Sequence, residues 1–241
     1  MNTLKSGIQN VSPDNFMNPS QVSILIATYN RSRLLPRAIR SVLDQTYSHW
    51  ELIIADEGSN HSTREVVSDF ASQDKRIIYL SAPHFGSIAK ISNFGLKIAK
   101  GKYVAILDDD DWWADTRKLE KQVSFLDSHL DYVGCGGGLI VVDAEGRPGR
   151  RFLKVEKDVN IRNQLLVSNP IINSSSIFRL DLARDLSFYD EKIPHLADWD
   201  FWLKIGLRGK LYNFPDYFVY YRIWTEGVSF KKQRSISFVS L

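Results

Sequence analysis

Four consecutive carboxylates, Asp108 to Asp111, follow directly after the apolar segment YVAIL, which has the composition of a buried strand. Two unit charges 4 Å apart repel by about 4 kcal/mol at the effective dielectric of a protein surface, so the cluster needs a counter-charge. A divalent cation supplies one, because Mg²⁺ or Mn²⁺ is held by carboxylates and often bridges them to substrate phosphates. On an extended segment, the D-x-D spacing directs Asp108 and Asp110 toward one ligand and Asp109 elsewhere.

The same acids also allow a structural interpretation. Acidic residues are favoured in the first turn of a helix, where the backbone dipole is positive, and the sequence runs on into a predicted helix over 115–129. A single acid would satisfy that helix. The run of four therefore favours a cation site.

Two other predicted strands also end in polar residues. The apolar runs at 22–27 and 50–56 are continuous, as in strands buried on both faces, and lead into TYN (28–30) and DEGS (56–59). Ligands of parallel sheets bind beyond the carboxyl ends of the strands. We therefore expect the three polar segments to meet at one edge of a sheet.

The elements that must position these residues alternate between strand and helix. Further strands are predicted at 76–80, 102–107 and 132–143, and helices within 31–46, over 62–73, over 87–101 with Gly101 at its end, and over 115–129. Repeated strand–helix units require right-handed crossovers. They predict an α/β fold with a mainly parallel sheet between two layers of helices.

The pattern changes after residue 143. A turn is followed by a short helix and a strand within 155–179, an amphipathic helix over 198–209, and two short aromatic-rich strands within 210–223. We interpret this part as an extension of the same domain. The predicted organisation is a flexible leader (1–20), one domain (21–225, with halves of about 21–112 and 113–225) and a basic tail (226–241).

Composition excludes several classes of protein. The net charge of +3 is too mild to indicate nucleic-acid binding. Cys135 is the only cysteine, so it cannot form an intramolecular disulfide, and we expect it to be a small buried residue. The longest nearly apolar run, 132–142, has 11 residues against the roughly 18 needed to span a bilayer. No membrane span is predicted, and contact with a membrane surface stays open.

Several motifs occur together in the order and spacing of a known family. The stretches VSILIATYNRSRLLPRAIR, IIADEGSN, NFGLKIAKGKYVAILDDDDWW and DWDFWLKI resemble the inverting family 2 of nucleotide-sugar glycosyltransferases, over about residues 21–224. The resemblance implies a GT-A fold, which is a Rossmann-like, mainly parallel sheet between helices with a C-terminal extension on the acceptor side.

The resemblance also implies roles for single residues on the donor side. Tyr29 is expected to stack on the nucleobase, Glu57 or Asp56 to bind the base, and Asp110 to bind the metal, with Asp108 at the ribose or the metal's water shell. The residues implied at the nucleotide and metal are Thr28, Tyr29, Asn30, Arg31, Asp56, Glu57, Asn93, Asp108, Asp109 and Asp110. The sequence has Glu57 where the family usually has aspartate, and Ser92 where an arginine usually precedes the asparagine.

On the acceptor side, the resemblance assigns the general base to Asp198. Ala197 stands at the usual glutamate, and Trp224 stands at a frequent histidine. A carboxylate at this position takes the proton of the attacking hydroxyl. The alternative for Asp198 is a helix N-cap, and the two roles are compatible.

The resemblance implies a metal-dependent, inverting enzyme that transfers a sugar from a nucleotide-sugar, expected to be a UDP-sugar. The implied acceptor is a hydroxyl of a glycan or of a lipid-linked molecule in surface polysaccharide synthesis. The expected cofactor is Mn²⁺ or Mg²⁺, and the expected location is the cytoplasm, with peripheral contact at the inner membrane face left open. Two alternatives stay open: a non-catalytic sugar-nucleotide or glycan-binding domain, and a sugar nucleotidyltransferase. The second is disfavoured because the glycine-rich, arginine-containing phosphate loop is missing after the first strand.

Overall fold

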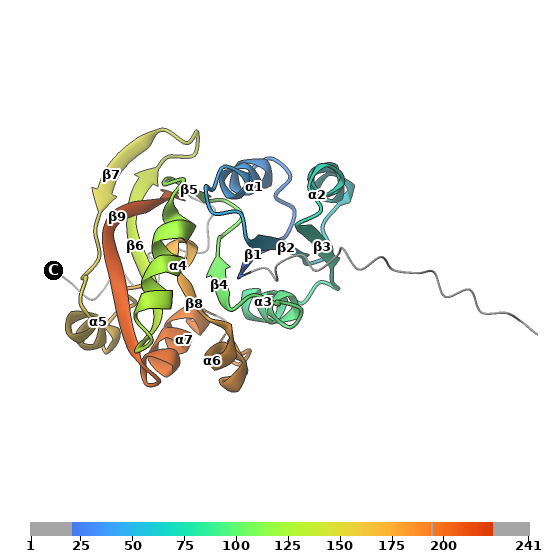
Figure 1. The fold of residues 1–241 in the computed structure, drawn as a ribbon. Helices are drawn as coiled ribbons and strands as arrows, with labels where there is room; N and C mark the ends of the chain where they lie inside the picture. Colours follow the sequence, from blue (N-terminus) through green and yellow to red (C-terminus); the bar gives the residue numbers. More distant parts are fainter. Residues whose placement is uncertain (1–20, 194, 224–241) are drawn as a thin grey trace, which may run out of the picture.

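The computed structural model describes residues 21–193 and 195–223 (Figure 1). The predicted leader (1–20), the basic tail (226–241) and Trp224 lie outside these described residues.

The first half of the fold is a parallel sheet in the order β3-β2-β1-β4. Its strands are β1 (Val22–Thr28), β2 (Trp50–Asp56), β3 (Ile77–Ser81) and β4 (Tyr103–Ile106). Apolar residues fill both faces of β1, because Leu25 packs into one core while Ile24 and Ile26 pack into the other. The continuous apolar runs of the sequence are thus explained by burial on both sides.

Helices cover both faces of this sheet. In Figure 1, α1 (Leu35–Leu43) and α2 (His61–Gln73) lie above β1–β3, and α3 (Ile88–Leu96) lies below them. The core on the α1 side also takes in α4 (Lys118–Ser128). The other core takes in residues of the C-terminal helices α5 (Asp158–Leu165), α6 (Leu180–Asp185) and α7 (Ala197–Gly206).

The second half continues the same sheet. The short strand β8 (Ile177–Arg179) pairs antiparallel with both β4 and β6 (Tyr132–Val142), and β6 pairs parallel with β9 (Lys210–Arg222). Two further strands pair antiparallel, β5 (Trp112–Trp113) with β9 and β7 (Pro148–Phe152) with β6. The predicted α/β class is confirmed. The sheet is parallel on the β3–β4 side and mixed beyond it.

Several expectations about single elements were wrong. The two strands expected within 210–223 are one strand, β9, because a register shift opposite Gly137 and Gly138 accommodates Pro215 without ending the pairing. The helix expected over 87–101 ends at Leu96. Gly101 is needed instead for close approach, since a Cβ there would lie 2.5 Å from the Ser23 nitrogen.

The helix expected over 115–129 begins only at Lys118. Asp108 to Asp111 therefore lie before β5, in the loop that leaves β4, and not in the first turn of α4. The helix-dipole interpretation of the acidic run is wrong for this reason.

Cys135 is fully buried in β6, as expected for a small apolar residue. Among the described residues, no helix combines the length and the apolar character required to cross a bilayer.

Candidate active site at the strand ends

Three polar segments meet at one edge of the sheet, as the sequence predicted. Strand register pairs Thr28 with Asp56 across β1 and β2, and Leu25 with Ile106 across β1 and β4. The segments after β1, β2 and β4 therefore leave the sheet side by side. This is the edge at which parallel sheets bind ligands.

Tyr29 and Asn30 directly follow β1. Tyr29 is 43% exposed, and its ring stacks on His84 with centroids 4.5 Å apart. Asn30 has a positive φ of 56°, donates its backbone N–H to Ser59 Oγ (2.8 Å) and accepts from the Asn60 backbone N–H (2.8 Å). Asn30 thus ties the loop after β1 to the loop after β2.

Asp56 and Glu57 at the end of β2 are both buried and already hydrogen-bonded. Asp56 accepts from the Ser59 backbone N–H (2.9 Å) and from the Tyr79 hydroxyl (2.7 Å). Glu57 Oε1 accepts from the backbone N–H groups of Phe85 (2.7 Å) and Ser87 (3.3 Å). A nucleotide contact from Asp56 or Glu57 stays a prediction.

A short 3₁₀ turn, η1 (Asn173–Ser175), holds the acidic run in place. Asn173 Nδ2 donates to Asp108 Oδ1 (2.8 Å), and the Ser174 hydroxyl donates to Asp111 Oδ2 (2.6 Å). Asp111 is 2% exposed and also accepts from the Arg222 backbone N–H (2.9 Å). Asp111 is therefore a structural anchor, whereas Asp108 to Asp110 are only half-buried.

Crowding and burial shift the protonation of these acids. Burial, with the neighbouring charge of Asp110, raises the pKa of Asp108 to about 6 and the pKa of Asp109 to about 7. The nearby Thr28 hydroxyl and the Arg31 charge partly offset the rise in the Asp109 pKa. The Thr28 hydroxyl is buried and makes no hydrogen bond of ordinary geometry. Burial and the charge of Asp108 raise the Asp111 pKa well above its usual range. These carboxylates lack sufficient positive charge around them.

The arrangement fits a divalent cation held jointly with a substrate phosphate. Within the described ranges, no group of three or more His, Cys, Asp or Glu side chains is placed to hold a metal ion alone. Mg²⁺ in nucleotide sites needs only one or two protein carboxylates, with water and phosphate oxygens completing the shell. The Asn173 Oδ1 atom, beside Asp108, is a buried acceptor with no hydrogen-bond partner. Asp108 and Asp110 are the residues that would hold the cation.

Asp198 lies close enough to the acidic run to affect it, although 90 residues separate it from Asp108 in the sequence. Its charge contributes to the raised pKa of Asp108, and the charges of Asp198 and Asp108 both contribute to the raised pKa of the buried Tyr189. Asn169 Nδ2 donates to Asp198 Oδ2 (3.0 Å). The N-cap of α7 is Leu196, so Asp198 lies in the first turn and is not a cap.

Asn93 is placed differently from the other predicted donor residues. It is 4% exposed, donates to the Tyr189 carbonyl (2.9 Å) and Glu191 Oε1 (3.0 Å), and accepts from the Tyr189 backbone N–H (3.0 Å). Its amide is fully used in joining α3 to the loop before α7. A role at the nucleotide stays a prediction for this residue.

The sequence reasoning missed the residues that position the acids: Asn169, Asn173 and Ser174. The run GCGGG in β6 was a usable signal for η1. A Cβ on Gly136 would lie 3.2 Å from Ser175 Oγ and 2.7 Å from Asn213 Oδ1, and the Gly137 N–H donates to Ser175 Oγ (3.1 Å). Gly136 thus leaves the room in which η1 sits against the sheet.

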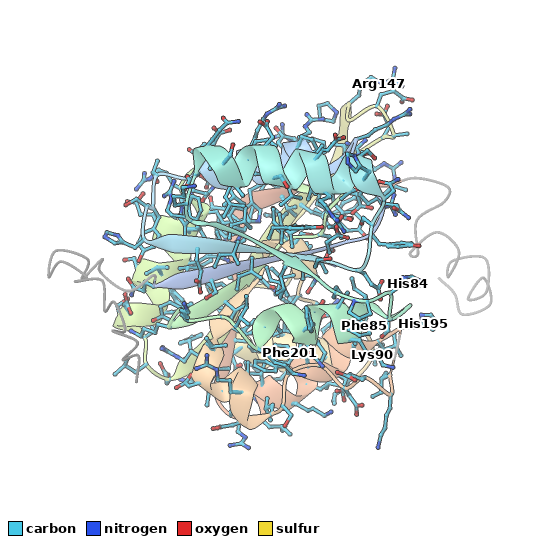
Figure 2. The ribbon with its side chains drawn as sticks, turned by 90° about the vertical axis from the view of Figure 1, so that its right-hand side faces the viewer. His84, Phe85, Lys90, Arg147, His195 and Phe201 are labelled. Carbon is cyan, nitrogen blue, oxygen red and sulfur yellow. The ribbon has the colours of Figure 1, made fainter. Side chains whose placement is uncertain are left out.

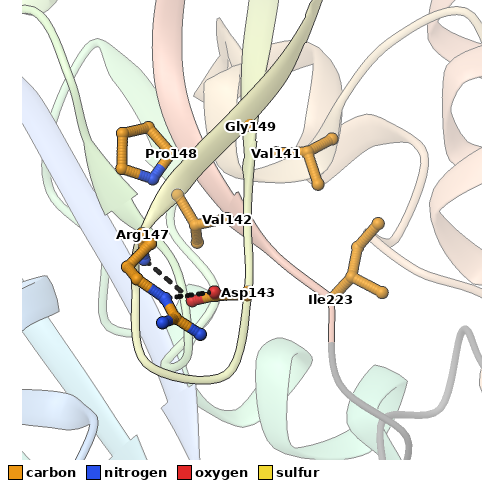
Figure 3. A pocket seen from close by; sticks show the side chains of 7 residues that line it. All are labelled: Val141, Val142, Asp143, Arg147, Pro148, Gly149 and Ile223. Atoms are coloured by element: carbon orange, nitrogen blue, oxygen red, sulfur yellow. Dashed lines mark hydrogen bonds and ion pairs between the residues drawn. The ribbon is translucent and has the colours of Figure 1, made fainter.

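A shallow pocket of about 390 Å³ lies at the β6–β7 turn and is not part of this site (Figure 3). Arg147 bonds to Asp143 within it, at 2.7 Å between side chains. None of the predicted site residues lines this pocket, whose lining is Val141, Val142, Asp143, Arg147, Pro148, Gly149 and Ile223.

Comparison with known proteins agrees with this fold. The sequence model described as glycosyl transferase family 2 matches residues 23–187, a range that includes the acidic run but not Asp198. The Escherichia coli UDP-Glc:alpha-D-GlcNAc-diphosphoundecaprenol beta-1,3-glucosyltransferase WfgD is 39% identical over 193 residues, which are 78% of this chain and 71% of the relative.

Solved structures show the same fold. Staphylococcus aureus TarS 1-349 in complex with UDP-GlcNAc matches with a TM-score of 0.69 and 21% identity over 91% of this chain. The mannosyltransferase PcManGT from Pyrobaculum calidifontis, in complex with GDP-Man and Mn²⁺, matches with a TM-score of 0.68 and 17% identity over 90% of this chain. The chain spans only 62% and 61% of those two chains.

Proposed function

The chain belongs to glycosyl transferase family 2, and we propose that it moves a sugar from a UDP-linked donor to a hydroxyl of a glycan or lipid-linked acceptor. The proposal rests on the meeting of the three strand ends at one edge of the sheet. Asp198 lies near this edge, since its charge adds to the effects of burial and of Asp110 that raise the pKa of Asp108. In this proposal, Asp108 and Asp110 face the nucleotide diphosphate, and Asp198 faces the attacking hydroxyl.

The donor side binds and orients the nucleotide. Tyr29 offers an exposed ring for stacking on the base, and Glu57 offers a carboxylate at its edge. Asp108 and Asp110 face the diphosphate. When bound there, Mn²⁺ or Mg²⁺ would neutralise the charge that grows on the leaving diphosphate. UDP as the nucleotide is supported by the Escherichia coli relative and the TarS structure, whose name and ligand contain it.

The acceptor side carries the proton. The acceptor oxygen forms a bond to the anomeric carbon while the bond from that carbon to the diphosphate oxygen breaks from the opposite face, which inverts the configuration. The Asp198 carboxylate takes the hydroxyl proton. Asn169 holds one carboxylate oxygen of Asp198 and so fixes its orientation.

A lipid-linked acceptor is favoured by the diphosphoundecaprenol acceptor in the name of the Escherichia coli relative. We propose that the enzyme takes part in surface polysaccharide synthesis and acts at the cytoplasmic face of the inner membrane through peripheral contact.

Exchange of the Asp198 carboxylate for an amide tests the catalytic part of the proposal. Asp198→Asn is expected to lower sugar transfer by about 10²- to 10⁴-fold, the usual contribution of a general base, while UDP binding is kept. The matched control is Asp200→Asn on the same helix, where Asp200 pairs with Lys204 at 2.6 Å and activity should stay near that of the wild type. Full transfer by Asp198→Asn would overturn the base assignment. No transfer by the wild type would favour a non-catalytic binding domain.

A further inference from the structure

His84 engages both residues that the proposed function places at the nucleobase, so its role rests on that function. Its imidazole stacks on Tyr29, with ring centroids 4.5 Å apart and the planes inclined by 23°. Nδ1 of the same ring lies 3.6 Å from Glu57 Oε2, an ion-pair distance when the ring is protonated but too long for a hydrogen bond. One planar, nitrogen-containing ring thus contacts the stacking residue and faces the carboxylate.

The spacing of the two rings decides how a base could enter. Stacked rings in proteins lie with centroids about 4.5–7 Å apart, and a third ring between Tyr29 and His84 would need roughly twice the stacking distance. The observed 4.5 Å leaves no room for it. The same imidazole lies 3.6 Å from Glu57 Oε2, so a base that stacks on this face of Tyr29 and reaches Glu57 must take the space of the imidazole.

The loop that carries His84 is anchored through its backbone, and the side chain is not buried. The Phe85 and Ser87 N–H groups donate to Glu57 Oε1, and Gly58, with φ of 75°, brings its turn close to the Ala82 carbonyl. The His84 side chain is 54% exposed, and Figure 2 shows His84 and Phe85 at one edge of the molecule. The ring can therefore rotate out while the loop stays attached to Glu57.

We infer that His84 is a placeholder for the nucleobase. In the nucleotide-free protein its imidazole fills the base position against Tyr29, and the incoming base displaces it. The side chain at position 84 therefore sets the affinity for the base part of the donor, because each binding event must first break the His84–Tyr29 stack.

Calorimetric titration of UDP with Mg²⁺ into position-84 variants tests this inference. His84→Ala is expected to bind UDP about twofold to tenfold more tightly, since no aromatic stack has to be broken. His84→Phe keeps a ring against Tyr29 and should bind no more tightly than the wild type. His49→Ala is the matched control and should not change the affinity, because His49 directly precedes β2 and lies at the opposite end of that strand from Asp56.

Equal or weaker binding by His84→Ala, with normal binding by the wild type, would overturn the placeholder and leave the proposed function intact. No UDP binding by wild type or variants would overturn the proposed function as well. NMR gives a second readout that needs no nucleotide. The His84 ring protons should be shifted upfield by Tyr29 in the free protein, and this shift should vanish in Tyr29→Leu. Unshifted His84 signals in the free wild type would contradict the inference.

Discussion

Asp108 and Asp109 carry the electrostatic cost of the site. Their pKa values are raised to about 6 and about 7, so the folded protein binds more protons than the unfolded chain between about pH 4 and pH 7. By linkage, their contribution to the free energy of unfolding falls as the pH rises through that window. At neutral pH the ionised acids therefore lower the stability of the metal-free protein. A bound cation would offset their repulsion.

Asp110→Asn should therefore stabilise the metal-free protein at pH 7.5 by about 1 kcal/mol, because it removes a charge that raises both pKa values. The gain should shrink at pH 5, where the neighbouring acids are protonated. Denaturant unfolding at the two pH values measures this. Asp69→Asn, an exposed acid on α2, is the control. A destabilised Asp110→Asn at pH 7.5 would show that the acids do not repel one another as described.

At the scale of elements, the site depends on how closely η1 approaches β6. Asn173 and Ser174 hold Asp108 and Asp111 in place, and Gly136 leaves room for the turn that carries them, since a Cβ there would lie 3.2 Å from Ser175 Oγ. The glycine-rich strand β6 thus allows η1 to lie against the loop that follows β4.

Gly136→Ala should displace η1, because its Cβ would lie 2.7 Å from Asn213 Oδ1 and 3.2 Å from Ser175 Oγ. We expect a loss of about 1–3 kcal/mol in stability, as for other overpacked sites, together with lower transfer activity. Gly149→Ala on the exposed strand β7 is the matched control, since its Cβ would lie at an ordinary 3.6 Å from the Val141 carbonyl. Thermal unfolding and a transfer assay measure both effects. Equal behaviour of the two variants would contradict the role given to Gly136.

At the scale of the whole molecule, local patterns predicted the first half of the domain, about residues 21–112, well. Continuous apolar runs and helical periodicity located β1 to β4 and α1 to α3, and the parallel topology then required the segments at 28–30, 56–59 and 108–111 to meet. The helix-dipole alternative for the acids failed because nothing in the sequence marks the short strand β5 that precedes α4.

The second half of the domain could not be predicted to the same depth. Its contacts join residues far apart in the chain, such as Asn169 with Asp198 and Asn173 with Asp108. Pro215 lies in a bulge of β9, whereas a proline in the sequence alone predicts the end of a strand. His84 was missed because a lone histidine in a loop has no periodic signal.

We expect the acids after β4 to hold a divalent cation together with the diphosphate of a nucleotide. The most direct test is the melting temperature of the wild type and Asp110→Asn with Mn²⁺ alone, UDP alone, and both. We predict a rise of about 5 °C or more for the wild type with both ligands at about 100-fold excess over Kd, and little with Mn²⁺ alone. Asp110→Asn should lose this rise. A wild type that does not respond to UDP with Mn²⁺, or an Asp110→Asn that responds fully, would contradict the account.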